Sequence, residues 1–179
     1  MGELMMKKIV QYGMLLVGSV LCLYSPISRT ISKYYQQNHV QEQHDRMGRI
    51  EISKIDVDLP IFLGTSEDVL QKGVGYMKES SLPGSGKSTH SLLAGHRGLP
   101  SGELFFRLNE LKEGDSFVIY TSGKELYYEV CDVQVIRPEE TDVLQVQKEK
   151  ELVSLITCTP YGINTHRLIV TGERKEKNE

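Results

Sequence analysis

Two short apolar runs near the C-terminus place the strongest constraint on the fold of this chain. Residues 152–157 and 168–170 are rich in leucine, isoleucine and valine, and a segment with Pro160, Gly162 and Asn164 separates them. Runs of this length with turn-forming residues between them indicate neighbouring β-strands. Cys158 follows the first run and Arg167 precedes the second. A thiol and a guanidinium are therefore expected to share a small site.

Other short segments extend the same pattern along residues 47–174 and predict a mainly β fold. Expected strands are residues 50–55, 59–63, 91–95, 116–121, 125–136, 153–157 and 167–171, with short helices over 67–72 and 102–111. Pro60 predicts that its strand lies at a sheet edge, because proline cannot donate to the ladder. Residues 122–124 predict a hairpin turn. Seven or eight short strands with two small helices predict a closed or nearly closed β-barrel.

Length and composition exclude several classes of function. The 179 residues fit one ordinary domain, and the net charge is −3 with 25% charged residues. A nucleic-acid partner has no support, because there is no basic surplus. The sequence has no glycine-rich phosphate loop and no CxxC or HExxH spacing, so it gives no signal for nucleotide or zinc chemistry.

The N-terminal region predicts a membrane anchor. Residues 9–27 form a 19-residue apolar run with lysines at positions 7 and 8 before it. At 1.5 Å per residue this run would be roughly 28 Å long, close to the hydrocarbon thickness of a bilayer. A cleaved signal peptide is the main alternative. We expect a single-pass membrane protein with residues 1–8 cytoplasmic, 9–27 as the transmembrane helix, 28–46 as a polar stalk, 47–174 as an extracellular catalytic domain and 175–179 as a charged tail.

Three residues carry the elements of a thiol acyl-transfer site. A cysteine attacks a carbonyl as thiolate, which a nearby cation or imidazolium favours. The reaction also needs a donor for the oxyanion and an acid for the leaving amine. Cys158 is the candidate nucleophile, His96 the proton-transfer residue and Arg167 the oxyanion-side group. A buried structural cysteine is the alternative for Cys158, and a surface turn residue is the alternative for His96.

The remaining histidines, arginines and cysteines receive weaker interpretations. His166 and Arg97 adjoin Arg167 and His96, so strand alternation turns their side chains away from the site. We interpret Arg97 as a surface or structural residue, and His90 as unrelated to catalysis. Of the cysteines, Cys131 is the only one that could pair with Cys158, because the membrane would separate Cys22 from both. An unpaired reactive thiol fits the sequence as well.

An apolar groove beside Cys158 is a further expectation. Tyr161, Ile163, Leu99, Leu104 and Phe105 are candidates to line it, although core packing is the alternative for most of them. The substrate-binding residues that we predict are Thr157, Tyr161 and Leu99.

Several motifs together resemble the sortases, the membrane-anchored cysteine transpeptidases of Gram-positive bacteria. SLITC at 154–158 resembles the sortase Thr-Leu-x-Thr-Cys signature. CTPYGINTHRLIVTGER at 158–174, ISKIDVDLPI at 52–61, VLQKGVG at 69–75 and AGHRGLP at 94–100 are similar to class C, pilin-polymerising members. The similarity covers about residues 48–174.

This resemblance implies an eight-stranded sortase barrel with catalytic roles for His96, Cys158 and Arg167. It implies that the thiolate cleaves the Thr–Gly bond of an LPxTG-like sorting signal in a pilin or surface protein. An acceptor lysine of the next pilin then forms an isopeptide bond, which makes the protein a thiol protease-like enzyme of pilus assembly at the cell wall. The chemistry requires no metal and no organic cofactor. The alternatives are attachment of single surface proteins to cell-wall peptide and a non-catalytic assembly scaffold.

Three departures from the class C pattern matter. Ser154 replaces the first threonine of the signature and keeps its hydroxyl. The Asp-Pro-aromatic motif of the lid that covers the cysteine in many class C members is absent from residues 28–48, so we expect an open site. A second, C-terminal membrane helix is also not present in the sequence, so we expect either that the N-terminal helix is the only anchor or that the chain is incomplete.

Overall fold

The computed structural model describes residues 5–6, 46–98 and 104–176. The chain divides into two units, residues 1–44 and 45–179, and the barrel belongs to the second. No helix within the described ranges is long and apolar enough to cross a bilayer. The predicted transmembrane helix, nearly all of the stalk and Leu99 lie outside those ranges.

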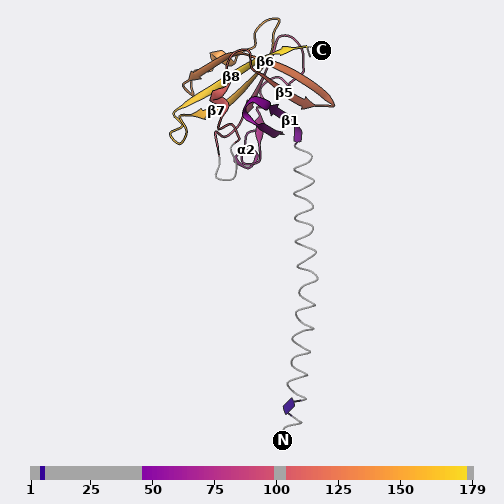
Figure 1. Cartoon of the computed structure of the whole chain (residues 1–179), viewed down its shortest axis with the longest axis vertical. Coiled ribbons are helices and arrows are strands. Elements are labelled where there is room, and N and C mark those ends of the chain that lie inside the picture. The colour runs from indigo at the N-terminus through magenta and orange to yellow at the C-terminus, as the bar shows by residue number, and fades with distance from the viewer. Residues whose placement is uncertain (1–4, 7–45, 99–103, 177–179) are drawn as a thin grey trace. The chain divides into compact units, whose positions relative to one another are not determined.

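Eight strands form one closed barrel, which confirms the predicted mainly β architecture (Figure 1). The strands are β1 Arg46–Ile52, β2 Val57–Leu63, β3 Val74–Tyr76, β4 Thr89–Ala94, β5 Ser116–Thr121, β6 Lys124–Ile136, β7 Glu151–Thr159 and β8 His166–Lys175. Their order around the barrel is β1-β2-β3-β4-β7-β8-β6-β5, and β5 pairs with β1. The described helices are short: α2 Glu67–Leu70 and the 3₁₀ turns η1 Ser53–Ile55, η2 Leu108–Glu110 and η3 Asp142–Leu144.

Strand alternation determines which side chains fill the barrel. In β7, Val153 and Leu155 are fully buried in the central apolar cluster. Residues at intervening positions of a strand point to the opposite face. Leu168 and Val170 of β8 and Leu93 of β4 belong to the same cluster. The positions that alternate with them in β4, β7 and β8 therefore face the outside of the barrel.

The hairpin of β5 and β6 confirms the predicted turn. Only Ser122 and Gly123 separate the two strands, and their φ angles are 49° and 73°. Positive φ at both central residues is the geometry of a type I′ turn, whose twist matches that of the flanking strands.

The predicted helix over residues 102–111 is wrong for the part that the structure describes. Residues 104–107 are turns, and only the 3₁₀ turn η2 follows. Leu104 has a φ of 37°, which an α-helix does not accommodate. The apolar residues at this spacing are nevertheless buried: Phe105, Leu108 and Leu111 are at most 2% exposed. The segment packs them into the core without forming an α-helix.

The prediction of an edge strand at Pro60 is also wrong. Strand β2 pairs with β1 on one side and with β3 on the other. Pairing with β3 begins only at Ile61, one residue after the proline, so the missing amide of Pro60 leaves no gap in that ladder. Strand β3 was not predicted, because its three residues are too few to show an alternating pattern.

The C-terminal strand is longer than expected, since β8 continues to Lys175 and takes in the start of the predicted tail. Glu173 pairs with both Leu152 and Glu129 across the two neighbouring strands. Charged residues can end a strand that pairs on both sides because their side chains reach solvent.

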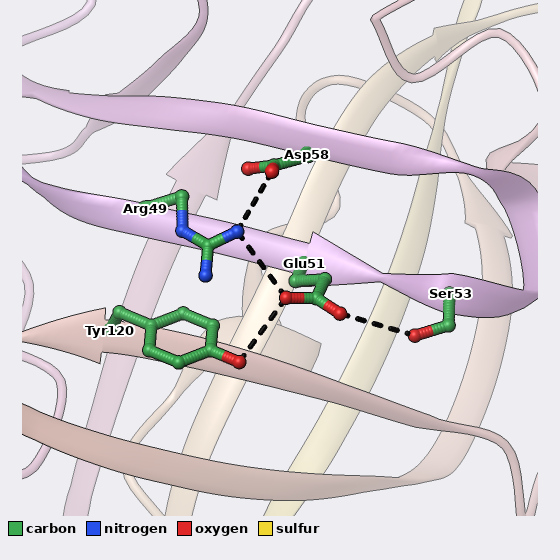
Figure 2. A network of polar contacts seen from close by, with 5 residues as sticks. All are labelled: Arg49, Glu51, Ser53, Asp58 and Tyr120. Carbon is green, nitrogen blue, oxygen red and sulfur yellow. Dashed lines mark hydrogen bonds and ion pairs between the residues drawn. The ribbon is translucent and has the colours of Figure 1, made fainter.

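A polar network ties the outer faces of β1, β2 and β5 together (Figure 2). Arg49 Nη1 donates to Asp58 Oδ2 at 2.8 Å and to Glu51 Oε2 at 3.3 Å. The hydroxyl of Tyr120 donates to Glu51 Oε2 at 3.2 Å, and the Arg49 guanidinium lies 4.1 Å from the Tyr120 ring centroid. One arginine thus connects three strands at the side where the barrel closes.

Candidate active site

Cys158 and Arg167 lie directly opposite each other on β7 and β8. Their Cα atoms are partners in the antiparallel register, and both side chains are partly exposed. Opposite residues in such a pair point to the same face of the sheet. Cys158 lies three positions after the core residue Leu155, and Arg167 lies one position before the core residue Leu168. An odd spacing along a strand puts two side chains on opposite faces. Both side chains therefore belong to the outer face.

The loop between β7 and β8 holds the Arg167 guanidinium. Its Nη1 donates to the carbonyl oxygens of Asn164 at 3.2 Å and of His166 at 3.1 Å. Asn164 has a φ of 59°, and its own amide donates to the Pro160 carbonyl at 2.9 Å. The guanidinium is thus anchored to backbone that comes directly after the cysteine strand.

His96 reaches the same region from β4, which runs parallel to β7. Ala94 pairs with Ile156, and the Gly95 amide donates to the Ile156 carbonyl at 3.0 Å. His96 follows Ala94 by two residues, as Cys158 follows Ile156. Continuing the register places His96 alongside Cys158 on the outer face. The structure therefore brings the three predicted residues to one end of three consecutive strands, β4, β7 and β8.

The His96 imidazole pairs with a carboxylate that the sequence did not identify. Its Nε2 lies 3.2 Å from Glu67 Oε1, on the first residue of α2. Gln71 Nε2 donates to the same oxygen at 3.2 Å. The hydrogen bonds from Gln71 and from His96 lower the pKa of the Glu67 carboxyl. The carboxylate is therefore ionised at neutral pH, next to the candidate proton-transfer residue.

Arg97 connects the His96 segment to the cysteine strand. Its Nη1 donates to Thr159 Oγ1 at 2.7 Å and its Nη2 to Asn109 Oδ1 at 2.8 Å. The Nε of Arg97 is buried and has no hydrogen-bond partner among the described residues. The interpretation as a structural residue fits these contacts better than that of a surface residue. Sequence spacing gave no sign that Arg97 would join the neighbours of His96 and Cys158.

Gly95 is required by packing beneath the site. A Cβ at this position would lie 2.7 Å from Cδ2 of the Phe105 ring, which is fully buried. Phe105 is thus a core residue, not part of an outer groove. The absence of a side chain at Gly95 lets this ring pack under the segment that carries His96.

An exposed aromatic pair lies beside the site. The rings of Phe106 and Tyr161 meet edge to face, with centroids 5.2 Å apart and an interplanar angle of 85°. They are 42% and 58% exposed, and a Cβ at Gly98 would touch both. Ile163, in the same loop as Tyr161, is 68% exposed. Phe106 was missed in the sequence because its neighbour Phe105 fits the apolar spacing better.

Thr157, by contrast, is only 2% exposed, and its Oγ1 is buried without a hydrogen-bond partner among the described residues. It shares the inward face with Leu155. This burial argues against contact between its side chain and a substrate.

His90, near the start of β4, belongs to a buried hydrogen-bond network that is separate from His96. Its Nδ1 lies 3.0 Å from the Gln145 carbonyl, which can only accept, so Nδ1 carries the proton. Its Nε2 then accepts from Ser154 Oγ at 2.8 Å, and Ser154 lies 2.7 Å from Thr171 Oγ1. His90 is 2% exposed, so it has no access to a substrate and remains a structural residue.

Both described cysteines are free. Partial burial raises the pKa of the Cys131 thiol, which donates to the Thr171 carbonyl at 3.4 Å. A raised pKa leaves less thiolate at neutral pH, which makes Cys131 a poor nucleophile.

Comparison with known proteins agrees with the barrel fold. The family model of the Sortase domain matches residues 50–175. Sortase D of Bacillus subtilis is 36% identical over 130 residues, which cover 71% of this chain and 63% of that protein. Sortase A of Bacillus anthracis is 32% identical over 127 residues, or 71% of this chain and 59% of the relative. The chain thus spans about six tenths of the length of these curated relatives.

Solved structures are more similar still. Sortase C of Streptococcus pneumoniae has a TM-score of 0.74 and 41% identity, covering 76% of this chain and 72% of that one. Sortase C-1 of Actinomyces oris has a TM-score of 0.72 and 52% identity, covering 74% and 73%. The chain belongs to the sortase family of cysteine transpeptidases, and its structural neighbours include class C sortases.

Proposed function

We propose that this protein is a transpeptidase in which Cys158 is the nucleophile, His96 transfers protons and Arg167 stabilises the oxyanion. The observation that carries the proposal is the register of β4, β7 and β8. It sets Cys158 opposite Arg167 and extends β4 towards Cys158 through the Gly95 contact. Partial exposure of Cys158 supports a reactive rather than a structural thiol.

The chemistry follows from these groups. The Cys158 thiolate attacks the threonine carbonyl carbon of an LPxTG-like signal, and the Arg167 guanidinium donates to the oxygen that becomes negative. The C–N bond to glycine breaks as the His96 imidazolium protonates the leaving amine. An amine then attacks the thioester, the C–S bond breaks and the thiol is regenerated.

The acceptor that we propose is a lysine of the next pilin subunit, which makes the function pilus assembly. Support comes from the similarity to sortase C of Streptococcus pneumoniae, whose structure was described in terms of catalysis and pilin substrate specificity. Anchoring by residues 9–27, with the barrel outside the cell, remains part of the proposal. Attachment of single surface proteins to cell-wall peptide is the second candidate, because the two curated relatives described above are proteins named sortase D and sortase A and not sortase C.

The test uses the full chain and a purified pilin with an LPxTG-like signal. We expect covalent ladders from the wild type, no ladders from Cys158→Ala, and no ladders when the acceptor lysine of the pilin is removed. Ladders that persist without the lysine would contradict polymerisation while leaving transpeptidation intact. Ladders that persist with Cys158→Ala would support the non-catalytic scaffold instead.

We further propose that the site is open in the resting enzyme, because residues 28–48 contain no Asp-Pro-aromatic motif. In a background with Cys22 and Cys131 changed to serine, iodoacetamide should label Cys158 rapidly. Slow labelling that accelerates after residues 1–45 are removed would show that the N-terminal region covers the thiol.

A further inference from the structure

The contact between Glu67 and His96 has no role in the reaction as written above. It joins residues 29 positions apart, with Oε1 and Nε2 separated by 3.2 Å. The side chain of His96 is 28% exposed and that of Glu67 is 64% exposed. The carboxylate comes from a separate element, α2, which is therefore placed against the end of β4.

Helix α2 presents this carboxylate in a defined position. The amides of Val69 and Leu70 both donate to the Ser66 carbonyl at 3.0 Å, which closes the first turn around Glu67. Gln71 donates to the carboxylate from one turn further along at 3.2 Å. The carboxylate therefore has two donors, one from its own helix and one from His96.

The pairing with Glu67 determines which ring nitrogen of His96 is left to exchange a proton in the reaction. An ionised carboxylate only accepts hydrogen bonds, so the Nε2 of His96 carries a proton in this contact. The nitrogen that remains to exchange a proton is Nδ1, which has no hydrogen-bond partner among the described residues. A carboxylate that fixes an imidazole in one tautomer and orientation is the arrangement that supports proton transfer in other nucleophilic enzymes.

We propose that Glu67 is a positioning residue that holds the His96 imidazole with Nδ1 directed towards Cys158. The proposal rests on the proposed role of His96 in the reaction. Glu67 does not touch the reacting atoms, so it acts through the orientation and tautomer of His96. Because Glu67 is largely exposed and His96 partly exposed, the contribution of the pair is moderate and is screened by salt.

Kinetics of the full chain test the proposal with a quenched fluorescent peptide that contains Leu-Pro-Ala-Thr-Gly. We expect Glu67→Ala to lower kcat about fivefold at about 50 mM salt, with KM unchanged, and the loss to shrink at about 1 M salt. Glu67→Asp should recover at least half of the lost kcat. Asp68→Ala is the matched control, since it removes the neighbouring carboxylate of the same helix, and should leave kcat unchanged.

The second readout needs no substrate. With ¹⁵N-labelled histidine, at a pH where the His96 imidazole is uncharged, the wild type should show the tautomer protonated at Nε2, and Glu67→Ala should show a mixture of both tautomers. An unchanged tautomer together with an unchanged kcat would overturn the proposal, as would an equal loss of kcat in Asp68→Ala. The two proposals separate cleanly: activity of Cys158→Ala would refute the proposed function, whereas an inactive Cys158→Ala with a fully active Glu67→Ala would refute only the role of Glu67.

Discussion

Arg97 links the segment of His96 to the strand of Cys158, so its loss should weaken both stability and catalysis. Its guanidinium donates to Thr159 at 2.7 Å and to Asn109 at 2.8 Å. Hydrogen bonds from a charged group contribute about 1.5–3 kcal/mol each when desolvated. Because Asn109 is exposed, its hydrogen bond contributes less to stability. The buried Nε of Arg97 has no partner among the described residues, so removing it stabilises the variant by about 1 kcal/mol. We expect Arg97→Ala to lower the free energy of unfolding by about 1–2 kcal/mol.

A double-mutant cycle isolates the contact that matters for the site. Arg97→Ala, Thr159→Val and the double variant are compared with the wild type by urea denaturation. We expect a coupling energy of about 1 kcal/mol and a lower kcat for peptide cleavage in both single variants. Arg97→Lys should restore little, since an ammonium cannot reach two partners with a planar fork. Effects that add to within about 0.3 kcal/mol would refute the link between Arg97 and Thr159.

Three further predictions concern the barrel. Burial lowers the pKa of His90 below 6.5, so at acidic pH the unfolded chain binds a proton more readily than the folded chain does. The free energy of unfolding should therefore fall as the pH drops below 6.5. Thermal denaturation scans at successive pH values should show this fall, and His90→Gln should flatten it. Gly95→Ala should cost about 1–3 kcal/mol in urea denaturation because its Cβ overlaps the Phe105 ring, and adding Phe105→Leu should recover part of the loss. Arg49→Met should lower the free energy of unfolding at low salt and lower it less at high salt, since the pair of Arg49 with Asp58 is partly exposed. A loss that does not change with salt would contradict an ionic contribution.

The elements that the sequence predicted correctly are those with local signals. Strands β7 and β8 follow from apolar runs around a turn-rich segment, and the β5–β6 hairpin follows from Ser122 and Gly123. The opposition of Cys158 and Arg167 could be inferred for the same reason. Two consecutive antiparallel strands fix their register through the loop that joins them.

The segment after His96 shows where local patterns fail. The spacing of Phe105, Leu108 and Leu111 fits a helical face, yet the chain buries all three through turns and one 3₁₀ turn. Burial alone produces this spacing whenever a loop is packed against the barrel. The ring of Phe105 packs against Gly95, a contact that depends on tertiary structure and not on helical propensity.

The supports of the candidate site escaped prediction for a different reason. Glu67 meets His96 across 29 residues, and Arg97 meets Thr159 across 62. No periodic pattern in the sequence predicts these two contacts. Each one depends on the tertiary structure and on the reach of one long side chain. The residues that we expect to carry the chemistry lie at strand ends, where register predicts them, whereas the residues that orient them come from a helix and a loop. Variation at Glu67 and Arg97 can therefore adjust the reactivity of the site without altering the barrel or the three residues at its centre.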